Sequence, residues 1–345
     1  MNQSLEYEEM NKTIMKRSFP QKIAGVFWNQ NEHRLRVLWR LSAAVLIFFI
    51  IALILALAAI PLRDVPILRV GQFVPMIAAI ITVWLASRLI DRRRFSDTGV
   101  YFRKPWWIDF GFGLLLGVAL MTAIFLVEWG LGWITVNETL RTGNPDQSFL
   151  TAILITALFF ISVGTAEELA FRGYFLLNLA EGLNSRWIKP KAALIISWIF
   201  TSVIFGFGHL GNPNATMVSS LNIALAGIFI GFAYVLTGSL ALPIGLHITW
   251  NFFQGNVFGF PVSGTTDWST TFLAVQQGGP EVWTGGSFGP EGGFIGLLGI
   301  LLGMAITALF LRFHYGKLTF YTQIPNPPEI TVEKEPGVSD PPGIN

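Results

Sequence analysis

The chain has 345 residues, of which 52% are hydrophobic and only 13% are charged. That charged share is about half of what an ordinary soluble domain carries. Apolar stretches of roughly twenty residues, the length that crosses a bilayer as a helix, recur along the chain. Composition therefore excludes a single soluble core. The net charge of +2 provides no basic surface for nucleic acid, and the absence of cysteine excludes disulfides, thiol nucleophiles and thiolate metal sites.

The predicted fold class is all-α, a polytopic membrane protein with about eight transmembrane helices, the fourth to seventh forming its core. The predicted parts, in chain order, are a basic segment (1–40), helices 1–3 (41–148), a core (149–260), a loop (261–290), helix 8 (291–317) and a tail (318–345). The helices are expected near 41–60, 70–90, 107–136, 149–180, 192–210, 215–237, 239–259 and 292–313. The third and fourth exceed one crossing, so each should tilt, break or include an interfacial piece.

Lysine and arginine in the short loops predict the orientation. The rich loops follow helices 2 and 4 and close helix 8, with Arg92, Arg93, Arg94, Arg103, Lys104, Arg186, Lys189, Lys191, Arg312 and Lys317. The alternate loops hold only Arg63, Arg69 and Arg141. Eight crossings then place both termini in the cytoplasm, with the protein as a multi-pass component of the cell membrane.

Two segments are unlike spans. Residues 261–290 contain Gly, Ser, Thr and Trp without Lys or Arg, and this topology makes them an extracytoplasmic loop. Residues 318–345 are rich in proline and acidic residues and are predicted to be a largely disordered tail. Pairs of glycines four residues apart should let helices approach closely: Gly113 and Gly117, Gly227 and Gly231, and Gly299 and Gly303.

Ionisable residues inside spans are costly and tend to be functional. Glu167 and Glu168 are adjacent near the end of an apolar stretch, and Arg172 follows one turn later. On a helix, Glu168 and Arg172 share a face and can pair. Glu167 points about 100° away and could face a cavity. A desolvated carboxylate poised near neutrality makes a useful general base.

Two further patterns carry histidines. Phe205 and His209 are four residues apart, so an aromatic ring lies beside the imidazole. His247 and Asn251 have the same spacing and can project together as donors to a developing oxyanion. Each pattern also has an ordinary explanation, as interfacial charge, a histidine bonded to a carbonyl, or an asparagine joining helices. If the three patterns had no functional meaning, all three ordinary explanations would have to hold at once on successive helices.

The chain thus contains, in this order and on hydrophobic helices, the patterns Glu-Glu-x-x-x-Arg, Phe-x-x-x-His and His-x-x-x-Asn. Together they resemble the CPBP (ABI) family of intramembrane proteases, which includes the type II CaaX prenyl proteases. The resemblance covers roughly residues 150–260, and every motif position is present. Helices 1–3, helix 8 and the tail contribute nothing to it.

The resemblance implies an intramembrane glutamic endopeptidase acting on a membrane-associated peptide or protein, without a cofactor or metal. Glu167 with His209 would activate a water, and His247 with Asn251 would stabilise the oxyanion. Glu168 and Arg172 would shape the site, and Phe205 would pack beside the imidazole. From the residues alone, Glu167 cannot be ranked above Glu168. A prenylated CaaX tail is one substrate option. The sequence does not indicate the oligomeric state.

Straight helices would place the site residues at different depths. At 1.5 Å per residue, Glu167 would lie ~27 Å below the outer face, His209 ~25 Å above the inner face, and His247 ~10 Å above it. We therefore expect helix 5 to begin near Arg186, or helices 4 and 5 to be broken or strongly tilted.

Three alternatives remain open. Glu167, His209 and His247 could hold zinc with a water in the fourth position, although the helical His-Glu-x-x-His arrangement is absent. The chain could be a non-catalytic membrane scaffold that keeps a protease-like fold. A transporter would be expected to show internal repeats, and none is clear between the two halves.

Overall fold

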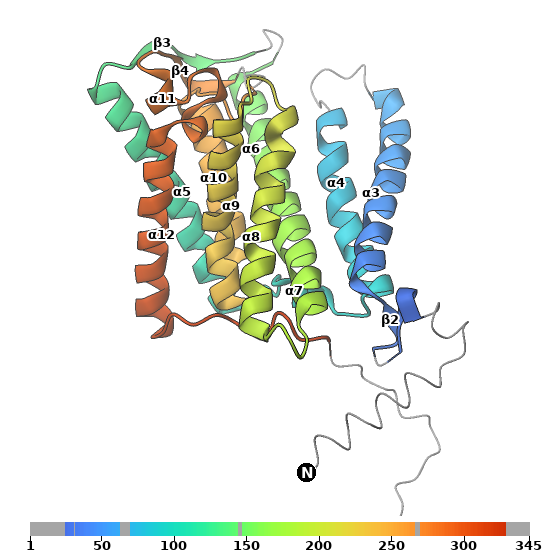
Figure 1. Cartoon of the computed structure of the whole chain (residues 1–345). Helices are drawn as coiled ribbons and strands as arrows, with labels where there is room; N and C mark the ends of the chain where they lie inside the picture. The colour runs from blue at the N-terminus through green and yellow to red at the C-terminus, as the bar shows by residue number, and fades with distance from the viewer. Residues whose placement is uncertain (1–24, 31, 63–69, 144–146, 266–269, 329–345) are drawn as a thin grey trace, which may run out of the picture.

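The computed structural model describes residues 25–30, 32–62, 70–143, 147–265 and 270–328. Helices that run side by side make up most of the molecule, with short strands at its two ends (Figure 1). Seven helices in the described part of the chain are long and apolar enough to cross a membrane. The predicted class, an all-α polytopic membrane protein, is confirmed.

The long helices lie close to the predicted positions. They are α3 (Val37–Ala59), α4 (Val70–Leu85, extended by the π-helical η2, Ala86–Ile90), α5 (Lys104–Gly130), α6 (Phe149–Glu168), α8 (Pro190–Gly208), α9 (Met217–Thr237) and α12 (Phe294–Tyr315). Helix α6 continues through the π-helical segment η4 (Leu169–Leu176) into α7 (Leu177–Leu183). The fourth predicted helix is therefore longer than one crossing, as expected, and forms one continuous helical run.

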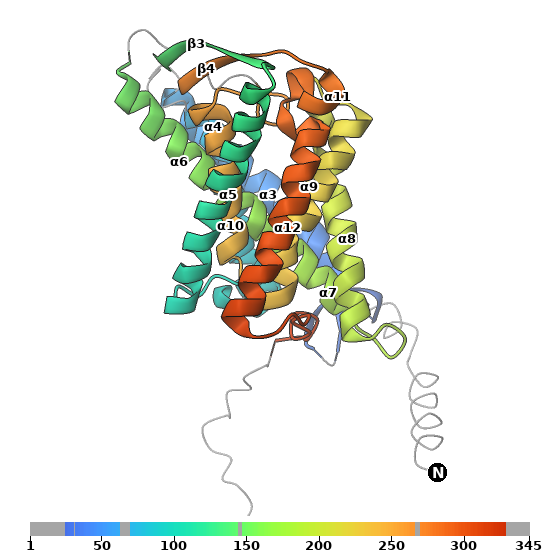
Figure 2. The ribbon, with the colours of Figure 1, turned by 90° about the vertical axis from the view of Figure 1, so that its left-hand side faces the viewer.

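The predicted seventh span is the interior helix α10 (Ala241–Phe252), which the π-helical segment η6 (Phe253–Val257) extends. It is shorter than the other seven, and it lies in the middle of the bundle (Figure 2). Every residue of α10 is buried or half-buried, and α5, α6 and α9 pack against it. An interior helix is apolar all round because its neighbours, and not lipid, cover it.

Glycines bring α5 and α10 into close contact. A Cβ at Gly113 would collide with the carbonyl of Leu242, and one at Gly245 would collide with the carbonyl of Phe110. The hydroxyl of Thr249 donates to the carbonyl of Leu114 at 2.8 Å. Small residues and a hydroxyl bond between backbones are typical of helix contacts in membranes. The predicted packing role of the Gly113 pair is confirmed.

The other predicted glycine pairs also lie at helix contacts. Gly227 and Gly231 of α9 face Ser202 and Trp198 of α8. On α12, Gly303 faces Phe229 of α9. These contacts fix the helices that carry the candidate site.

The third helix ends earlier than the predicted range of 107–136. Helix α5 stops at Gly130, and Gly132 follows with a φ of 72°. The chain then forms β3 (Ile134–Arg141), which pairs antiparallel with β4 (Thr271–Gln277). Glycine adopts positive φ without steric cost, so it ends the helix here and starts the strand.

The predicted loop 261–290 carries regular structure in its described residues. It contains β4, the single-turn helix α11 (Glu281–Thr284) and the 3₁₀ turn η7 (Gly286–Phe288), and the 3₁₀ turn η8 (Pro290–Gly292) follows. Buried Glu128 at the end of α5 accepts a hydrogen bond from Gln277 Nε2 at 2.8 Å. We call this end of the bundle the loop side. Residues 266–269 lie outside the described residues.

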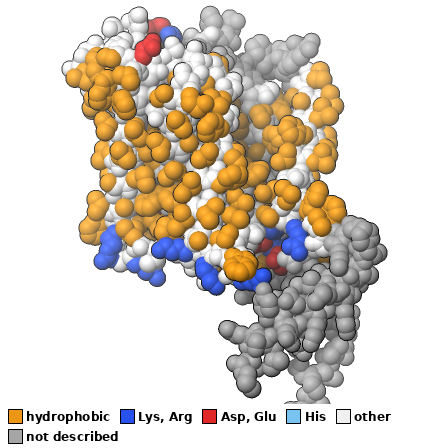
Figure 3. Space-filling model, viewed as in Figure 1, with side chains coloured by type: hydrophobic (Ala, Val, Ile, Leu, Met, Phe, Trp, Pro, Cys, Tyr) orange, Lys and Arg blue, Asp and Glu red, His pale blue; other side chains and the backbone are white. Residues whose placement is uncertain are grey.

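Lysine and arginine side chains gather at the opposite end, which we call the basic side (Figure 3). The hairpin β1 (Trp28–Asn29) and β2 (Arg34–Leu35) lies there. Arg34 and Arg40 are buried and bind the carboxylate of Glu181, as Arg93 does. The described residues of the predicted basic segment are thus partly buried. Burial of these cations would be unfavourable without a partner, and Glu181 provides one. Residues 1–24 lie outside the described residues.

The first residues of the predicted tail differ from a disordered segment. The amide of Tyr321 donates to the carbonyl of Val235 at 2.8 Å, and Asn184 Nδ2 donates to the carbonyl of Pro325 at 3.0 Å. Ile324 is buried. Because Phe320 and Ile324 provide apolar side chains, this part can pack on the basic side despite the prolines. Residues 329–345 lie outside the described residues.

The close approach of α5 and α10 predicts the effect of a larger side chain. Gly113→Leu should lower the free energy of unfolding by about 1–3 kcal/mol or more, because overpacking forces the two backbones apart. Thermal unfolding of the protein in detergent measures this. Gly111→Leu, on the same helix, is the control, because a Cβ at Gly111 has no atom within 4 Å among the described residues. Equal stability of the two variants would contradict the packing argument.

Candidate active site

The two adjacent glutamates lie at the end of α6, where the chain passes into η4. Glu168 is fully buried, whereas the side chain of Glu167 is 25% exposed and lines a cavity. The difference follows from their angular separation of about 100° on the helix. Irregular π-helical turns are frequent at functional sites. The structure therefore distinguishes the two carboxylates, which the sequence left unranked.

Glu168 is at the centre of a buried polar network. Its Oε1 accepts from Arg172 Nη1 at 2.8 Å and from His247 Nδ1 at 2.8 Å. Arg172 also donates from Nη2 to the carbonyl of Gly227 at 2.9 Å, and its guanidinium lies 4.8 Å from the centre of the Phe205 ring. The predicted pairing of Glu168 with Arg172 is confirmed. The network joins α6, η4, α9 and α10, because a buried carboxylate needs such partners.

His247 lies between the two glutamates. An ionised carboxylate only accepts hydrogen bonds, so Nδ1 donates to Glu168 and this bond assigns the tautomer. The other nitrogen, Nε2, is 3.7 Å from Oε2 of Glu167. His247 therefore presents Nε2 to the cavity, with its orientation fixed from behind.

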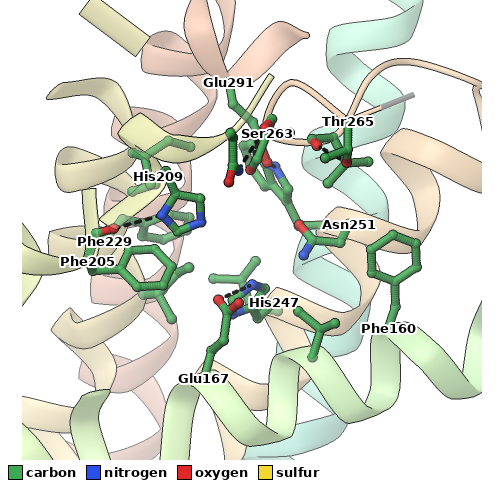
Figure 4. A pocket seen from close by; sticks show the side chains of 18 of the residues that line it. Phe160, Glu167, Phe205, His209, Phe229, His247, Asn251, Ser263, Thr265 and Glu291 are labelled. Atoms are coloured by element: carbon green, nitrogen blue, oxygen red, sulfur yellow. Dashed lines mark hydrogen bonds and ion pairs between the residues drawn. The ribbon is translucent and has the colours of Figure 1, made fainter. Parts of the chain in front are cut away.

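His209 follows α8 and faces the same cavity from another side (Figure 4). Its Nδ1 is 2.7 Å from the carbonyl oxygen of Phe205, which can only accept, so Nδ1 donates. In the neutral ring this leaves Nε2 as an acceptor. The Phe205 ring lies edge-on at 4.8 Å from the imidazole, which confirms the predicted packing of Phe205 beside it.

Asn251 is one turn after His247 on α10 and lines the cavity. Figure 4 shows His209, His247, Glu167 and Asn251 around one space. The cavity holds about 170 Å³, enough for several waters. Much of its remaining wall is apolar, including Phe160, Val163, Phe229, Ile230 and Trp250. Charged and polar groups beside such an apolar wall interact more strongly than they would in bulk water.

Straight helices would have placed Glu167, His209 and His247 at different depths, but in the structure all three line one cavity. Helix α6 is strongly inclined, as Figure 2 shows, and the helix containing it runs on to Leu183. Helix α8 is continuous and begins at Pro190, not near Arg186. The predicted tilt is therefore present in helix 4. The predicted start of helix 5 near Arg186 is wrong, because residues 184–189 form the turn before Pro190.

Sequence reasoning missed one acidic residue of the cavity. Glu291 lies in η8, is buried and lines the same cavity. It accepts hydrogen bonds from the backbone and hydroxyl of Ser263, both at 2.8 Å, and from Trp250 Nε1 at 3.2 Å. The one feature of the sequence that could have indicated Glu291 is its position as an acidic residue directly before the last apolar run.

Within the described ranges, no three His, Cys, Asp or Glu side chains come together as a possible metal site. Glu167 contacts His247, while His209 stands across the cavity. The site presents a carboxylate and two imidazole nitrogens to a small space, a set of groups that suits acid–base chemistry on a water.

Comparison with known proteins identifies this part of the chain. Residues 148–253 match the family model described as type II CAAX prenyl endopeptidase Rce1-like. We call these residues the Rce1-like domain, after the family model that they match. It contains Glu167, Glu168, Arg172, Phe205, His209, His247 and Asn251. The resemblance noted from the three motifs is thus confirmed. Glu291 and helices α3–α5 and α12 lie outside the matched segment.

A curated relative is similar over a longer region. The chain is 28% identical over 179 residues to the uncharacterized protein YyaK of Bacillus subtilis (strain 168). The match covers 51% of this chain and 56% of YyaK, so the chain spans little more than half the length of this relative. No solved structure matches the chain. Together with the seven apolar helices, the Rce1-like domain makes this a multi-pass membrane protein.

The network around Glu168 predicts the effect of a conservative change. Arg172→Lys should lower the free energy of unfolding by about 1–3 kcal/mol, because one ammonium cannot reproduce the fork that reaches both Glu168 and Gly227. Thermal unfolding in detergent provides the measurement. Arg103→Lys, an exposed position at the start of α5, serves as the control. A loss no larger for Arg172→Lys than for the control would refute this role.

Proposed function

We propose that the protein is an intramembrane endopeptidase that hydrolyses a peptide bond of a membrane-associated peptide or protein. The observation that carries the proposal is the position of His247, held by Glu168 at 2.8 Å and facing Glu167 at 3.7 Å. His209 and Asn251 line the same cavity, and residues 148–253 match the model of an endopeptidase family, which supports the proposal.

The first chemical step is activation of water. A water between Glu167 and Nε2 of His209 would find one carboxylate and one neutral nitrogen able to accept its proton. Removal of that proton leaves hydroxide to form a C–O bond with the substrate carbonyl. Glu167 and His209 are thus proposed as the general-base pair.

The second requirement is stabilisation of the oxyanion. Asn251 can donate from Nδ2, and protonated His247 can donate from Nε2 while Nδ1 remains bound to Glu168. Collapse of the intermediate breaks the C–N bond, and the proton taken from water passes to the leaving amine.

A second cavity supports the proposal that the substrate reaches the site from within the bilayer. This space of about 330 Å³ lies between α3, α4 and the helix containing α6. It borders Glu167, and its other lining residues are mainly apolar, including Phe48, Met76 and Phe171. An apolar segment of a membrane peptide or protein fits such a surface.

The proposed location is the cell membrane, with both termini in the cytoplasm. The described ends of the chain both lie on the basic side (Figures 1 and 3). Loops rich in Lys and Arg remain on the cytoplasmic side of membranes. The candidate cavity, which contains Ser263 and Glu291 of the loop-side segments, then lies toward the extracytoplasmic half.

Single substitutions test the catalytic assignment. Purified protein should cleave members of a library of membrane-inserted peptides, with and without a prenylated CaaX tail. Glu167→Gln, His209→Ala and His247→Ala should each lower kcat/KM by roughly 10²–10⁴-fold, since each removes a group of the acid–base and oxyanion machinery. Glu138→Gln and His314→Ala, both exposed, are the matched controls. Cleavage by all three site variants at the parent rate would instead favour a non-catalytic scaffold.

Chelation tests the zinc alternative. Prolonged treatment of the purified protein with 1,10-phenanthroline, followed by removal of the chelator, should leave the rate of peptide cleavage unchanged, because the proposed steps use only side chains. The metal content of the treated sample is measured in parallel. Loss of cleavage that returns on addition of Zn²⁺ would show that a metal performs the reaction.

A further inference from the structure

The loop side contributes a tight turn to the candidate cavity. The backbones of Val262 and Thr265 exchange hydrogen bonds at 3.0 and 2.9 Å, with Ser263 and Gly264 between them. Both central residues have positive φ, 48° and 82°, which is the pattern of a type I′ turn. Val262, Ser263 and Thr265 line the cavity. We call residues 262–265 the roof turn.

Ser263 is in a conformation that its side chain does not favour. Positive φ is uncommon for residues other than glycine and costs free energy unless the surroundings hold it. Asn212 Nδ2 donates to the carbonyl of Ser263 at 2.9 Å, and the amide of Gly264 donates to the carbonyl of Phe288 at 2.9 Å. Neighbouring loops therefore hold the roof turn from two sides.

Glu291 makes the remaining contacts to Ser263. Oε2 accepts from both the backbone amide and the hydroxyl of Ser263 at 2.8 Å, while Oε1 accepts from Trp250 Nε1 at 3.2 Å. Trp250 precedes Asn251 and lies three residues after His247 on α10. One buried carboxylate thus joins the roof turn to the helix that carries two of the proposed catalytic groups (Figure 4).

We propose that Glu291 is a positioning residue of the candidate active site, whose carboxylate fixes the roof turn against α10 so that the cavity keeps its shape. The inference rests on the proposed function, to which it adds a residue outside the Rce1-like domain. Glu291 acts through Ser263 and Trp250 and takes no part in bond making.

A carboxylate is required because three donors converge on it. An ionised carboxylate has acceptors on both oxygens, whereas a glutamine amide would turn an NH₂ group toward one of the N–H donors. Burial raises the pKa of Glu291 above its ordinary value, and the two hydrogen bonds from Ser263 oppose that rise because they favour the charged form.

The test compares Glu291→Gln with Glu281→Gln, an exposed glutamate in the same part of the loop side. Two quantities are measured: hydrogen exchange of the peptide covering residues 259–265, and kcat and KM on the peptide library. For Glu291→Gln, exchange should rise by about tenfold or more. Its kcat should fall roughly 10–100-fold with little change in KM, because misplaced groups slow the chemistry. Glu281→Gln should match the parent in both.

A second substitution separates positioning from direct chemistry and from misfolding. Glycine accepts positive φ without cost, so Ser263→Gly in the Glu291→Gln background should recover part of the lost kcat. Exchange of the peptides from α9 and α12 should stay at the parent level in every variant, which shows that the bundle is folded.

Three results would overturn the inference: exchange and kcat of Glu291→Gln equal to the parent, faster exchange with unchanged kcat, or a lost kcat with unchanged exchange. A parent that cleaves no peptide would sink the proposed function. The exchange measurement needs no substrate and would still decide whether Glu291 holds the roof turn in place.

Discussion

The buried carboxylate of Glu168 is the group on which the arrangement of the site depends. In the middle of an apolar bundle, an unpaired charge would be costly. Arg172 and His247 both donate to its Oε1 at 2.8 Å, and Arg172 continues to the backbone of α9. Pairing this one charge therefore fixes the relative positions of three helices. It also turns Nε2 of His247 toward the partly exposed Glu167 and leaves that carboxylate for chemistry.

The interior helix α10 shows how packing supports this geometry. Residues His247 and Asn251 lie on a helix that neighbours cover on all sides. Glycines at 113 and 245 let α5 approach its backbone closely enough for Thr249 to donate to the carbonyl of Leu114. Because both backbones are in contact, α10 has little room to slide or rotate. A helix held this way can place polar side chains at a fixed position.

The loop side closes the cavity at its other end. The roof turn, the segment after α8 and the 3₁₀ turn before α12 meet there. Asn212 donates a hydrogen bond to Ser263, and Glu291 accepts one from it. Residues from the Rce1-like domain and from outside it thus enclose one space. The family match covers the three motifs. The cavity is closed by segments outside these motifs.

The sequence by itself determined the membrane character, seven of the spans within a few residues, and the three motifs, because hydropathy and four-residue spacing are local properties. The Glu168–Arg172 pair and the Phe205–His209 contact followed for the same reason. Only the tertiary structure decided that Glu167 and not Glu168 faces the cavity, that α5 ends at Gly130 to form β3, and that Glu291 joins the site. Those outcomes depend on contacts between segments far apart in the chain, such as Trp250 with Glu291, which no local pattern encodes.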